Sequence, residues 1–451
     1  MAEPHEIKAS PTDAVRIAAT LLRVGRDADA EPILLRVLEM VPEHADALHF
    51  LGMLRHRQGE SHAAVELLRR AVERAPDYLD ARNNLGNLLR LIGRRDAAEQ
   101  EYRGILDADP SHVDAWVNLG SLHRRRGEIV QSLECYQRAL ALDPNDVRAW
   151  LNQASALRRA GRLADAEAAF RRVLDIQPEH TEAYLSLGRL LDRTRRHAEA
   201  ADVYRRWLEL APDHPVAHHM LAACGVGAAP ARASDDFVRR TFDAFAEGFD
   251  ETLEVLEYRA PRLVADALAA ARPQPAEPLR ILDAGCGTGL CGPLLKPLAG
   301  YLAGVDLSPA MVARARGRRA EPHISTGEPI YDHLAVAELT SWIAAQSQQF
   351  DAVVAADVLV YFGTLDAAFR AAATALRPRG IFVFTTERHD EDGATAGFKL
   401  RPHGRYSHSE RYLRDELCAA GLALERFSTV ELRMEFGEAV AGTLAVARMP
   451  P

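Results

Sequence analysis

The sequence predicts two domains of different classes: an all-α array of repeated helix hairpins, then an α/β domain with a doubly wound, mostly parallel sheet. Two observations predict this arrangement. Prolines recur at a fixed interval through the first half, and in the second half a short apolar stretch runs into the glycine-rich segment Asp283–Leu290. At 451 residues the chain is also too long for one ordinary core.

Composition narrows the class of protein. An apolar fraction of 48% and a charged fraction of 26% are typical of a folded globular chain. The net charge of −9 does not favour a nucleic-acid partner, and no apolar run approaches the length of a bilayer span. The five cysteines form no C-x-x-C pair, and the first residues show no signal-peptide pattern. We therefore expect a cytoplasmic protein with no metal, no membrane and no nucleic-acid partner.

The first half of the chain repeats every 34 residues. Small residues and aromatic residues follow the prolines in the same register, and a glycine series ends the first helix of each hairpin. The prolines are Pro42, Pro76, Pro110, Pro144, Pro178 and Pro212, and the turn glycines are Gly25, Gly59, Gly93, Gly127 and Gly161. The packing aromatics are Tyr102, Tyr136, Phe170 and Tyr204. This pattern resembles the tetratricopeptide repeat, and it predicts a solenoid of about six repeats plus a capping helix over 11–224.

The resemblance implies that the first helix of each repeat lines a concave groove. At one position of that helix, successive repeats carry an asparagine, which is similar to the asparagine ladder of the O-linked N-acetylglucosamine transferase repeats. At a second position, successive repeats carry an arginine. These candidate partner-binding residues are Asn84, Asn118, Asn152, Arg90, Arg124 and Arg158. We expect a protein or peptide partner, although the asparagines could be common repeat residues and the arginines solvated. A role in homo-oligomer assembly is the alternative.

Residues 225–233 are rich in Gly, Ala and Pro and are interpreted as a linker, so that the α/β domain spans 234–451. A helix is expected from Ser234 onward. Its aromatic residues Phe245 and Phe249 could be core, or they could form a lid over a ligand.

The glycine-rich segment continues a short strand that ends at Asp283, and its G-x-G-x-G spacing departs from the dinucleotide fingerprint. The next apolar run ends in Asp306, whose carboxylate could accept from both hydroxyls of a ribose. A similar turn with another ligand is the alternative. Together these residues resemble motif I and the acidic loop of class I S-adenosylmethionine-dependent methyltransferases. The expected fold is then a Rossmann-like sheet with an antiparallel edge hairpin, formed by 423–432 and 440–447.

The resemblance implies S-adenosylmethionine as the cofactor and assigns residues to its parts: the loop to its amino-acid moiety, Asp306 to the ribose, and Leu307, Met311, Glu338 and Leu339 to the adenine. The implied cofactor-binding residues are Asp283, Gly285, Cys286, Gly287, Gly289, Asp306, Leu307, Met311, Glu338, Leu339 and Asp357. Asp357 falls where the family meets both cofactor and substrate. The Asp-Val-Leu-Val sequence there lacks the proline-aromatic cluster of base amino-methyltransferases.

An amine or hydroxyl acceptor would need a base, and the candidates are Asp357, Tyr361, Tyr406 and His408. The last two lie in 387–410, which is predicted to be a polar loop whose histidine spacing matches no metal site. The whole arrangement resembles predicted methyltransferases with N-terminal tetratricopeptide repeats. Three hypotheses follow: methylation of a protein, peptide or carrier-bound substrate recruited by the repeats, methylation of a small molecule with the repeats serving assembly, or a scaffold without enzymatic activity.

Overall fold

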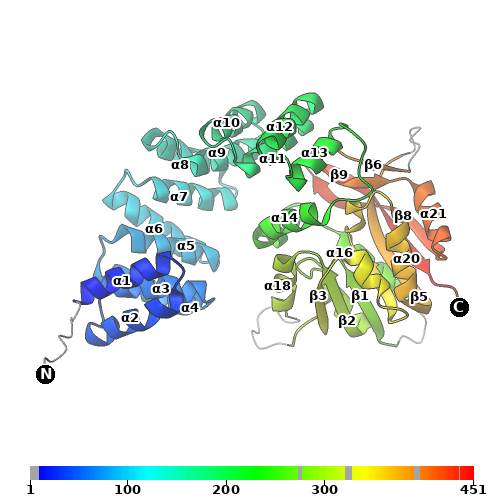
Figure 1. Ribbon diagram of the computed structural model, residues 1–451, viewed down its shortest axis with the longest axis horizontal. Helices are drawn as coiled ribbons and strands as arrows, with labels where there is room; N and C mark the ends of the chain where they lie inside the picture. The colour runs from blue at the N-terminus through cyan, green and yellow to red at the C-terminus, as the bar shows by residue number, and fades with distance from the viewer. Residues whose placement is uncertain (1–9, 273–276, 320–327, 391–396, 436) are drawn as a thin grey trace, which may run out of the picture. The chain divides into compact units, whose positions relative to one another are not determined.

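The computed structural model describes residues 10–272, 277–319, 328–390, 397–435 and 437–451. Within these ranges the first half of the chain is helical and the second half is α/β, which confirms the predicted fold class (Figure 1). Contacts divide the chain into two compact units, Met1–Leu187 and Gly188–Pro451. The second unit therefore includes the last repeat helix as well as the sheet.

The repeats are pairs of helices, with a first helix of 13 residues and a second of 14. Their bounds are α1 Pro11–Arg23, α2 Asp27–Met40, α3 Ala45–Arg57, α4 Ser61–Arg74, α5 Leu79–Leu91, α6 Arg95–Ala108, α7 Val113–Arg125, α8 Ile129–Leu142, α9 Val147–Arg159, α10 Leu163–Ile176, α11 Thr181–Arg193 and α12 His197–Leu210, followed by α13 Pro215–Ala223.

Glycine and aromatic residues set the packing of each pair. The turn glycines all have positive φ, for example +85° at Gly59, and in the sixth pair Arg195 takes this conformation with a φ of +60°. A Cβ added at Gly120 would lie 2.7 Å from Cε1 of Tyr136, which is fully buried. The predicted small-residue and aromatic layers therefore lie in contact, and they let the two helices of a repeat approach closely.

The second unit is built on a nine-stranded sheet in the order β3-β2-β1-β4-β5-β7-β6, with β9 pairing β5 and β8 pairing β9. The strands are β1 Leu279–Ala284, β2 Ala299–Asp306, β3 His333–Val336, β4 Phe350–Ala355, β5 Leu376–Arg388, β6 Phe398–Leu400, β7 Tyr406–His408, β8 Ala423–Glu435 and β9 Glu438–Arg448. The predicted edge hairpin is β8–β9, and both of its pairings are antiparallel. The strands β1 to β5 pair in parallel.

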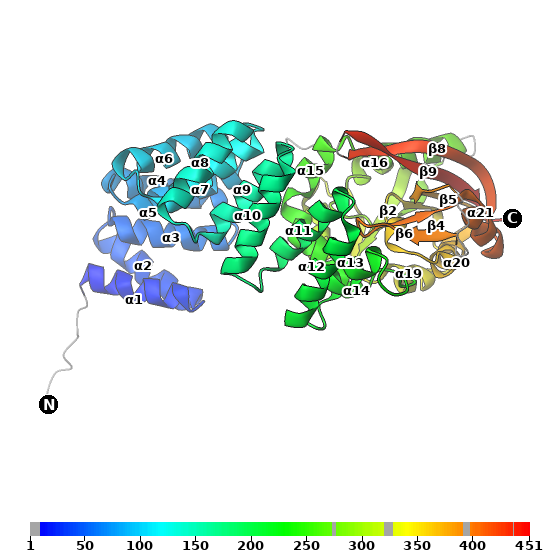
Figure 2. The same ribbon diagram turned by 90° about the horizontal axis from the view of Figure 1, so that it is seen from above.

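Helices cover both faces of this sheet (Figure 2). On one face Leu282 and Val353 pack with Phe369 of α20, and on the other Ile281 packs with Leu268 of α16. The helices of this unit are α14 Asp235–Phe245, α15 Phe249–Val255, α16 Ala260–Ala271, α17 Gly292–Leu295, α18 Pro309–Gly317, α19 Leu339–Ala344, α20 Asp366–Ala375 and α21 Glu410–Ala419. The first strand lies between β2 and β4, so the order of the strands reverses at its carboxyl end, where a doubly wound sheet binds its ligand.

The prediction that 387–410 is a loop was wrong in part, because it contains β6 and β7. The Tyr406 and His408 side chains of β7 are buried, and the strand pairs with the end of β5. The segment before α14 is also bonded to the sheet domain, since Ala231 O accepts from the backbone N–H of Gly363 at 2.8 Å. We keep 11–224, 225–233 and 234–451 as our proposed domain boundaries.

Candidate active site

The glycine-rich turn follows β1 and is fixed to the end of β2. Gly285, Gly287 and Gly289 all have positive φ, of +73°, +54° and +85°. The backbone N–H groups of Gly285 and Cys286 donate to Val305 O at 2.8 and 3.0 Å. The turn therefore has a defined shape at the carboxyl edge of the sheet, with Cys286 packed inward and 5% exposed.

Two of these glycines are needed for different reasons. A Cβ at Gly285 would lie 2.2 Å from Cγ2 of Val358, so the turn packs directly against the segment after β4. A Cβ at Gly287 would meet only Cε1 of Phe249, at 4.0 Å. The surface over Gly287 is therefore open to a ligand, with an aromatic ring at its border.

Asp283 lies beneath the turn and is 1% exposed. The hydroxyl of Tyr331 donates to its Oδ2 at 2.6 Å, whereas its buried Oδ1 has no hydrogen-bond partner in the described part of the chain. Burial raises the pKa of Asp283 to about 7, and the Tyr331 hydrogen bond opposes that shift. The Oδ1 atom of Asp283 could therefore accept a hydrogen bond from an N–H group of a ligand bound at the turn.

Asp306 ends β2 and faces the turn. It accepts from the backbone N–H of Gly287 at 2.9 Å and from that of Ser308 at 2.9 Å, one bond to each carboxylate oxygen. Each oxygen keeps a second lone pair, so both can still accept from a pair of ribose hydroxyls. Burial raises the pKa of Asp306, and the backbone N–H groups oppose that shift.

The helices α14 and α15 are attached to the turn by two aspartates. Asp243 accepts from Ser308 Oγ and from the first free N–H of α18, and Asp250 accepts from Thr288 Oγ1. Arg318 forms an ion pair with Asp250 and donates from Nε to Thr288 O at 2.9 Å. These bonds hold the segment that carries Phe249 beside the open surface of the turn.

The residues that the family resemblance assigned to adenine lie after β2 and β3. Met311 is 1% exposed within α18, whereas Leu307 is half-buried. Glu338 caps α19, which begins at Leu339, and its carboxylate accepts from Thr340 N at 3.1 Å. Burial favours the protonated form of Glu338, but these capping hydrogen bonds hold its pKa at about 2. Glu338 thus already stabilises a helix terminus, and contact with adenine stays a prediction.

Asp357 follows β4 and belongs to a buried ionic cluster. It adopts a φ of +57°, which costs about 1 kcal/mol or more in a residue other than glycine and is typical of functional sites. Arg433 of β8, 3% exposed, donates to its Oδ2 at 2.6 Å, to Glu435 at 2.7 Å and to Glu387. Arg405 donates to Glu387 and Glu435, each at 2.6 Å.

These ion pairs affect the pKa values of the carboxylates in the cluster. Burial raises the pKa of Asp357, and Arg433 opposes that shift. Burial also acts to raise the pKa of Glu387, but Arg405 and Arg433 hold it at about 2. The Oδ1 atom of Asp357 is buried and has no hydrogen-bond partner among the described residues. Arg433 therefore fixes Oδ2 of Asp357, whereas Oδ1 keeps its lone pairs for a ligand.

The remaining catalytic candidates differ in accessibility. Tyr361 is half-buried, and its ring lies 5.3 Å from that of Phe242. Tyr406 is buried and donates to Pro230 O at 2.8 Å. His408 is also buried, and its Nε2 lies 2.9 Å from Phe362 O, so this nitrogen carries the hydrogen. Burial lowers the pKa of His408 to about 4. The charge of Asp357 adds to the raised pKa of Tyr361, so the half-buried Tyr361 lies near Asp357, whereas Tyr406 and His408 bind backbone carbonyls.

The predicted asparagine ladder lies within the Met1–Leu187 unit, and all three amides are half-buried. The Asn84 amide nitrogen lies 2.8 Å from His49 Nε2, and the Asn118 amide nitrogen donates to Asn83 Oδ1 at 2.9 Å. Asn84 and Asn118 therefore use one N–H each within the repeats, and they keep a second N–H for a partner. Asn152 occupies the same phase of α9.

The predicted arginine phase is half-buried rather than fully solvated. Burial raises the pKa values of Tyr102 and Tyr136, and Arg90 and Arg124 oppose those shifts, so each arginine lies near the buried tyrosine of its own repeat. Arg158 occupies the same phase. Whether these side chains bind a partner stays a prediction.

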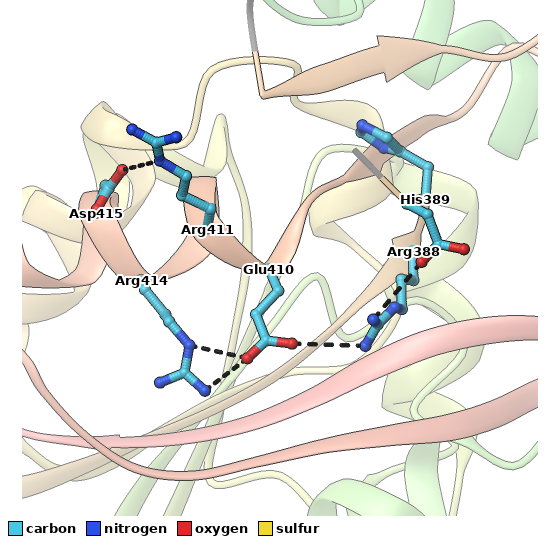
Figure 3. Close-up of a pocket in the computed structure, with 7 residues that line it drawn as sticks. Arg388, His389, Glu410, Arg411, Arg414 and Asp415 are labelled. Atoms are coloured by element: carbon cyan, nitrogen blue, oxygen red, sulfur yellow. Dashed lines mark hydrogen bonds and ion pairs between the residues drawn. The ribbon is translucent and has the colours of Figure 1, made fainter. Parts of the chain in front are cut away.

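A separate pocket of about 430 Å³ lies beside α21, and charged side chains line it (Figure 3). Figure 3 shows Glu410 between Arg388 and Arg414. The ion pairs of Glu410 measure 3.7 Å to Arg388 and 2.7 Å to Arg414, and a third ion pair joins Arg411 to Asp415. These charges satisfy one another, and the lining includes none of the glycine-turn residues.

Sequence reasoning missed Arg433, Asp243 and Asp250. Arg433 is one arginine in an edge strand, 76 residues after its partner Asp357, and no local pattern distinguishes it. The two aspartates lie on α14 and α15 among other acidic residues. Because α14 and α15 are separate helices, the spacing of the two aspartates in the sequence did not indicate that both would bind the segment around the glycine-rich turn.

Comparison with family models identifies both halves of the chain. A tetratricopeptide repeat model matches residues 15–78, 51–113, 83–147, 117–181 and 151–215, and a methyltransferase domain model matches residues 256–426. Among the described residues, no helix combines the length and the hydropathy that a bilayer span requires.

The curated relatives that match this chain are named methyltransferases. The chain is 32% identical over 170 residues to the ubiquinone biosynthesis O-methyltransferase of Xanthomonas axonopodis pv. citri, a match that covers 35% of this chain and 68% of the relative. It is 43% identical over 76 residues to methyltransferase-like protein 27 of Homo sapiens, with 17% of this chain and 31% of the relative covered. Among solved structures, the chain is 21% identical to PilF of Pseudomonas aeruginosa, with a TM-score of 0.41, covering 45% of this chain and 93% of that one.

Proposed function

Because this chain belongs to the S-adenosylmethionine-dependent methyltransferases and carries tetratricopeptide repeats before its methyltransferase domain, we propose that it methylates a protein, peptide or carrier-bound acceptor that the repeats recruit. The observation that carries the donor half of this proposal is Asp306, whose two oxygens each keep a free lone pair beside the open surface of Gly287. The acceptor half rests on the repeats.

The residues at the glycine turn fit the methyl donor. Asp306 would bind the ribose, and the unsatisfied Oδ1 of Asp283 would accept from the amino group of the methionine part. When bound, S-adenosylmethionine supplies a methyl group on a cationic sulfur, which becomes a neutral thioether as the acceptor gains the methyl group and loses a proton. The side chain of Phe249 borders the site and would exclude water.

Asp357 is the residue that we propose to take the acceptor proton. Its Oδ1 is unpartnered and buried, and its Oδ2 is fixed by Arg433 at 2.6 Å. Burial raises the pKa of Asp357, which makes it a better base than an exposed aspartate. Tyr406 and His408 already bind backbone carbonyls, so we assign them to the support of the site rather than to proton transfer.

The repeats are proposed to deliver the acceptor. Asn84 and Asn118 each keep one amide N–H for a peptide carbonyl, and Arg90 and Arg124 add positive charge in the same helices. An extended peptide with acidic residues would fit these groups. This surface lies within the Met1–Leu187 unit.

The test follows the labelled methyl group from S-adenosylmethionine into a native cell extract, with the full chain as enzyme. We expect label in the acid-precipitable fraction, and at least about fivefold less label with the Asn118→Ala, Arg124→Ala double variant. Arg171→Ala, which removes an exposed ion pair with Glu167 on α10, is the matched control and should change nothing. Equal label from the double variant and wild type would show that the repeats do not recruit the acceptor.

A second candidate function is O-methylation of a small molecule, with the repeats serving assembly. The relatives named as ubiquinone biosynthesis O-methyltransferases favour it. In the same experiment this function predicts label in the acid-soluble fraction, in equal amount from wild type and the double variant.

A further inference from the structure

Tyr258 lies beside Arg433, although no sequence pattern distinguishes it. The segment before α16 is hydrogen-bonded to β8 on both sides of this pair. The backbone N–H of Arg259 donates to Leu432 O at 2.8 Å, and that of Met434 donates to Leu256 O at 2.7 Å. These two bonds place Tyr258 opposite Arg433, the residue that holds Asp357.

Three polar groups around this point lack a partner. Among the described residues, the Oδ1 atom of Asp357 is buried without one, and the half-buried side chains of Tyr258 and Tyr361 form no hydrogen bond through their hydroxyls, which are therefore free to bind a ligand. Burial raises the pKa of both phenols, and the charge of Asp357 adds to that shift, so the three groups lie close enough to interact. Native structures rarely leave a buried oxygen such as Asp357 Oδ1 unsatisfied, and a ligand with an O–H or N–H group would satisfy it.

The same three groups border the donor site. Val358, the residue after Asp357, packs against Gly285 of the glycine turn. The ring of Phe242 lies 5.3 Å from that of Tyr361 and 6.1 Å from that of Phe249, which borders Gly287. An aromatic wall thus runs from the open surface of the turn to the unpartnered groups.

We propose that Asp357, Tyr258 and Tyr361 together form the face that receives the methyl acceptor, and that this face selects a neutral O–H or N–H nucleophile. The inference rests on the proposed methyl transfer and names the chemical class of its acceptor. One lone pair of the nucleophile takes the methyl group, its proton passes to Asp357 Oδ1, and the two phenols form hydrogen bonds to the nucleophile that orient it. A carboxylate acceptor is excluded, because it would meet the charge of Asp357.

Sinefungin tests this face without an identified acceptor. It has an amine-bearing carbon where S-adenosylmethionine has its methyl-bearing sulfur, so its amine would reach the groups that face the transferred methyl. S-adenosylhomocysteine lacks that amine. The ratio of the two affinities, measured by calorimetric titration into the full chain, therefore reports on the acceptor face alone.

We expect wild type to bind sinefungin about tenfold or more tightly than S-adenosylhomocysteine, since hydrogen bonds to a charged group have that effect. Asp357→Asn should abolish the advantage, and Tyr258→Phe and Tyr361→Phe should each reduce it about threefold or more. The tyrosine variants remove hydroxyls without partners, so they lose no hydrogen bond of the fold. Tyr301→Phe, at the opposite end of β2 from Asp306, is the matched control and should keep the wild-type ratio.

Two results would overturn the inference in distinguishable ways. If wild type binds S-adenosylhomocysteine but shows no preference for sinefungin, or if Tyr258→Phe and Tyr361→Phe keep the full preference, the acceptor face is wrong while methyl transfer stands. If well-folded wild type binds neither compound, the proposed function fails and the inference fails with it.

Discussion

His408 should make the stability of the sheet domain depend on pH, and His408→Gln should remove that contribution. In the folded chain its Nε2 donates to the backbone carbonyls of Phe362 at 2.9 Å and Gly363 at 3.2 Å, and the side chain is fully buried. Burial lowers the pKa of His408 from 6.5 to about 4. The neutral ring is therefore the form that the fold accommodates.

The sign and size of the effect follow from the two pKa values. Because the folded pKa lies below the unfolded one, the unfolded chain binds the proton first as pH falls, and the folded state loses stability. The contribution is complete above about pH 6.5 and is lost progressively toward about pH 4. Between about pH 7 and about pH 5, this one group should reduce the free energy of unfolding by about 2 kcal/mol.

Urea unfolding followed by tryptophan fluorescence at these two pH values would measure the effect. The difference between wild type and His408→Gln cancels the other titrating groups, and wild type should lose about 2 kcal/mol more than the variant on acidification. A difference below about 0.5 kcal/mol would refute the conclusion that His408 is buried and neutral.

Three further substitutions test the site and the repeats. Gly285→Ala would place a methyl group 2.2 Å from the Val358 side chain, at a residue whose φ is +73°. The affinity for S-adenosylhomocysteine should therefore fall about tenfold or more in calorimetric titration, and an unchanged affinity would contradict the packing of the turn. Asp250→Asn breaks the ion pair with Arg318, and stopped-flow measurement should show faster dissociation of S-adenosylhomocysteine by about threefold or more; an unchanged rate would show that α15 does not hold the ligand. Gly120→Ala should destabilise the repeats by about 1–3 kcal/mol in urea, because the new methyl would lie 2.7 Å from Tyr136, and it should leave S-adenosylhomocysteine affinity unchanged.

Local regularity decided how much of the fold could be predicted. In the repeats each turn glycine and each packing aromatic recurs in register, so the helix hairpins follow from the period alone, and Arg195 in place of the sixth glycine did not disturb the pattern. In the sheet domain, strands with continuous apolar runs were also predictable. The strands β6 and β7 were not, because each has only three residues and β7 reads Tyr406, Ser407 and His408.

In the candidate site, too, only contacts that follow from a regular pattern could be predicted, and contacts between residues far apart in the sequence could not. Asp283 and Asp306 lie at the carboxyl ends of β1 and β2, so their proximity at this edge follows from a parallel sheet. The partners of Asp357 could not be predicted, because Arg433 and Tyr258 reach it from separate segments that only tertiary hydrogen bonds bring together. Contacts of this kind depend on how β8 pairs with the chain before α16, and the sequence carries no period that indicates it.

Calorimetric titration of S-adenosylmethionine and S-adenosylhomocysteine into wild type and Asp306→Ala tests the central claim most directly. The account predicts micromolar binding to wild type, weakened about tenfold or more by the variant, because two ribose hydroxyls lose a charged acceptor. Absence of binding to well-folded wild type, or equal affinity for the variant, would contradict it.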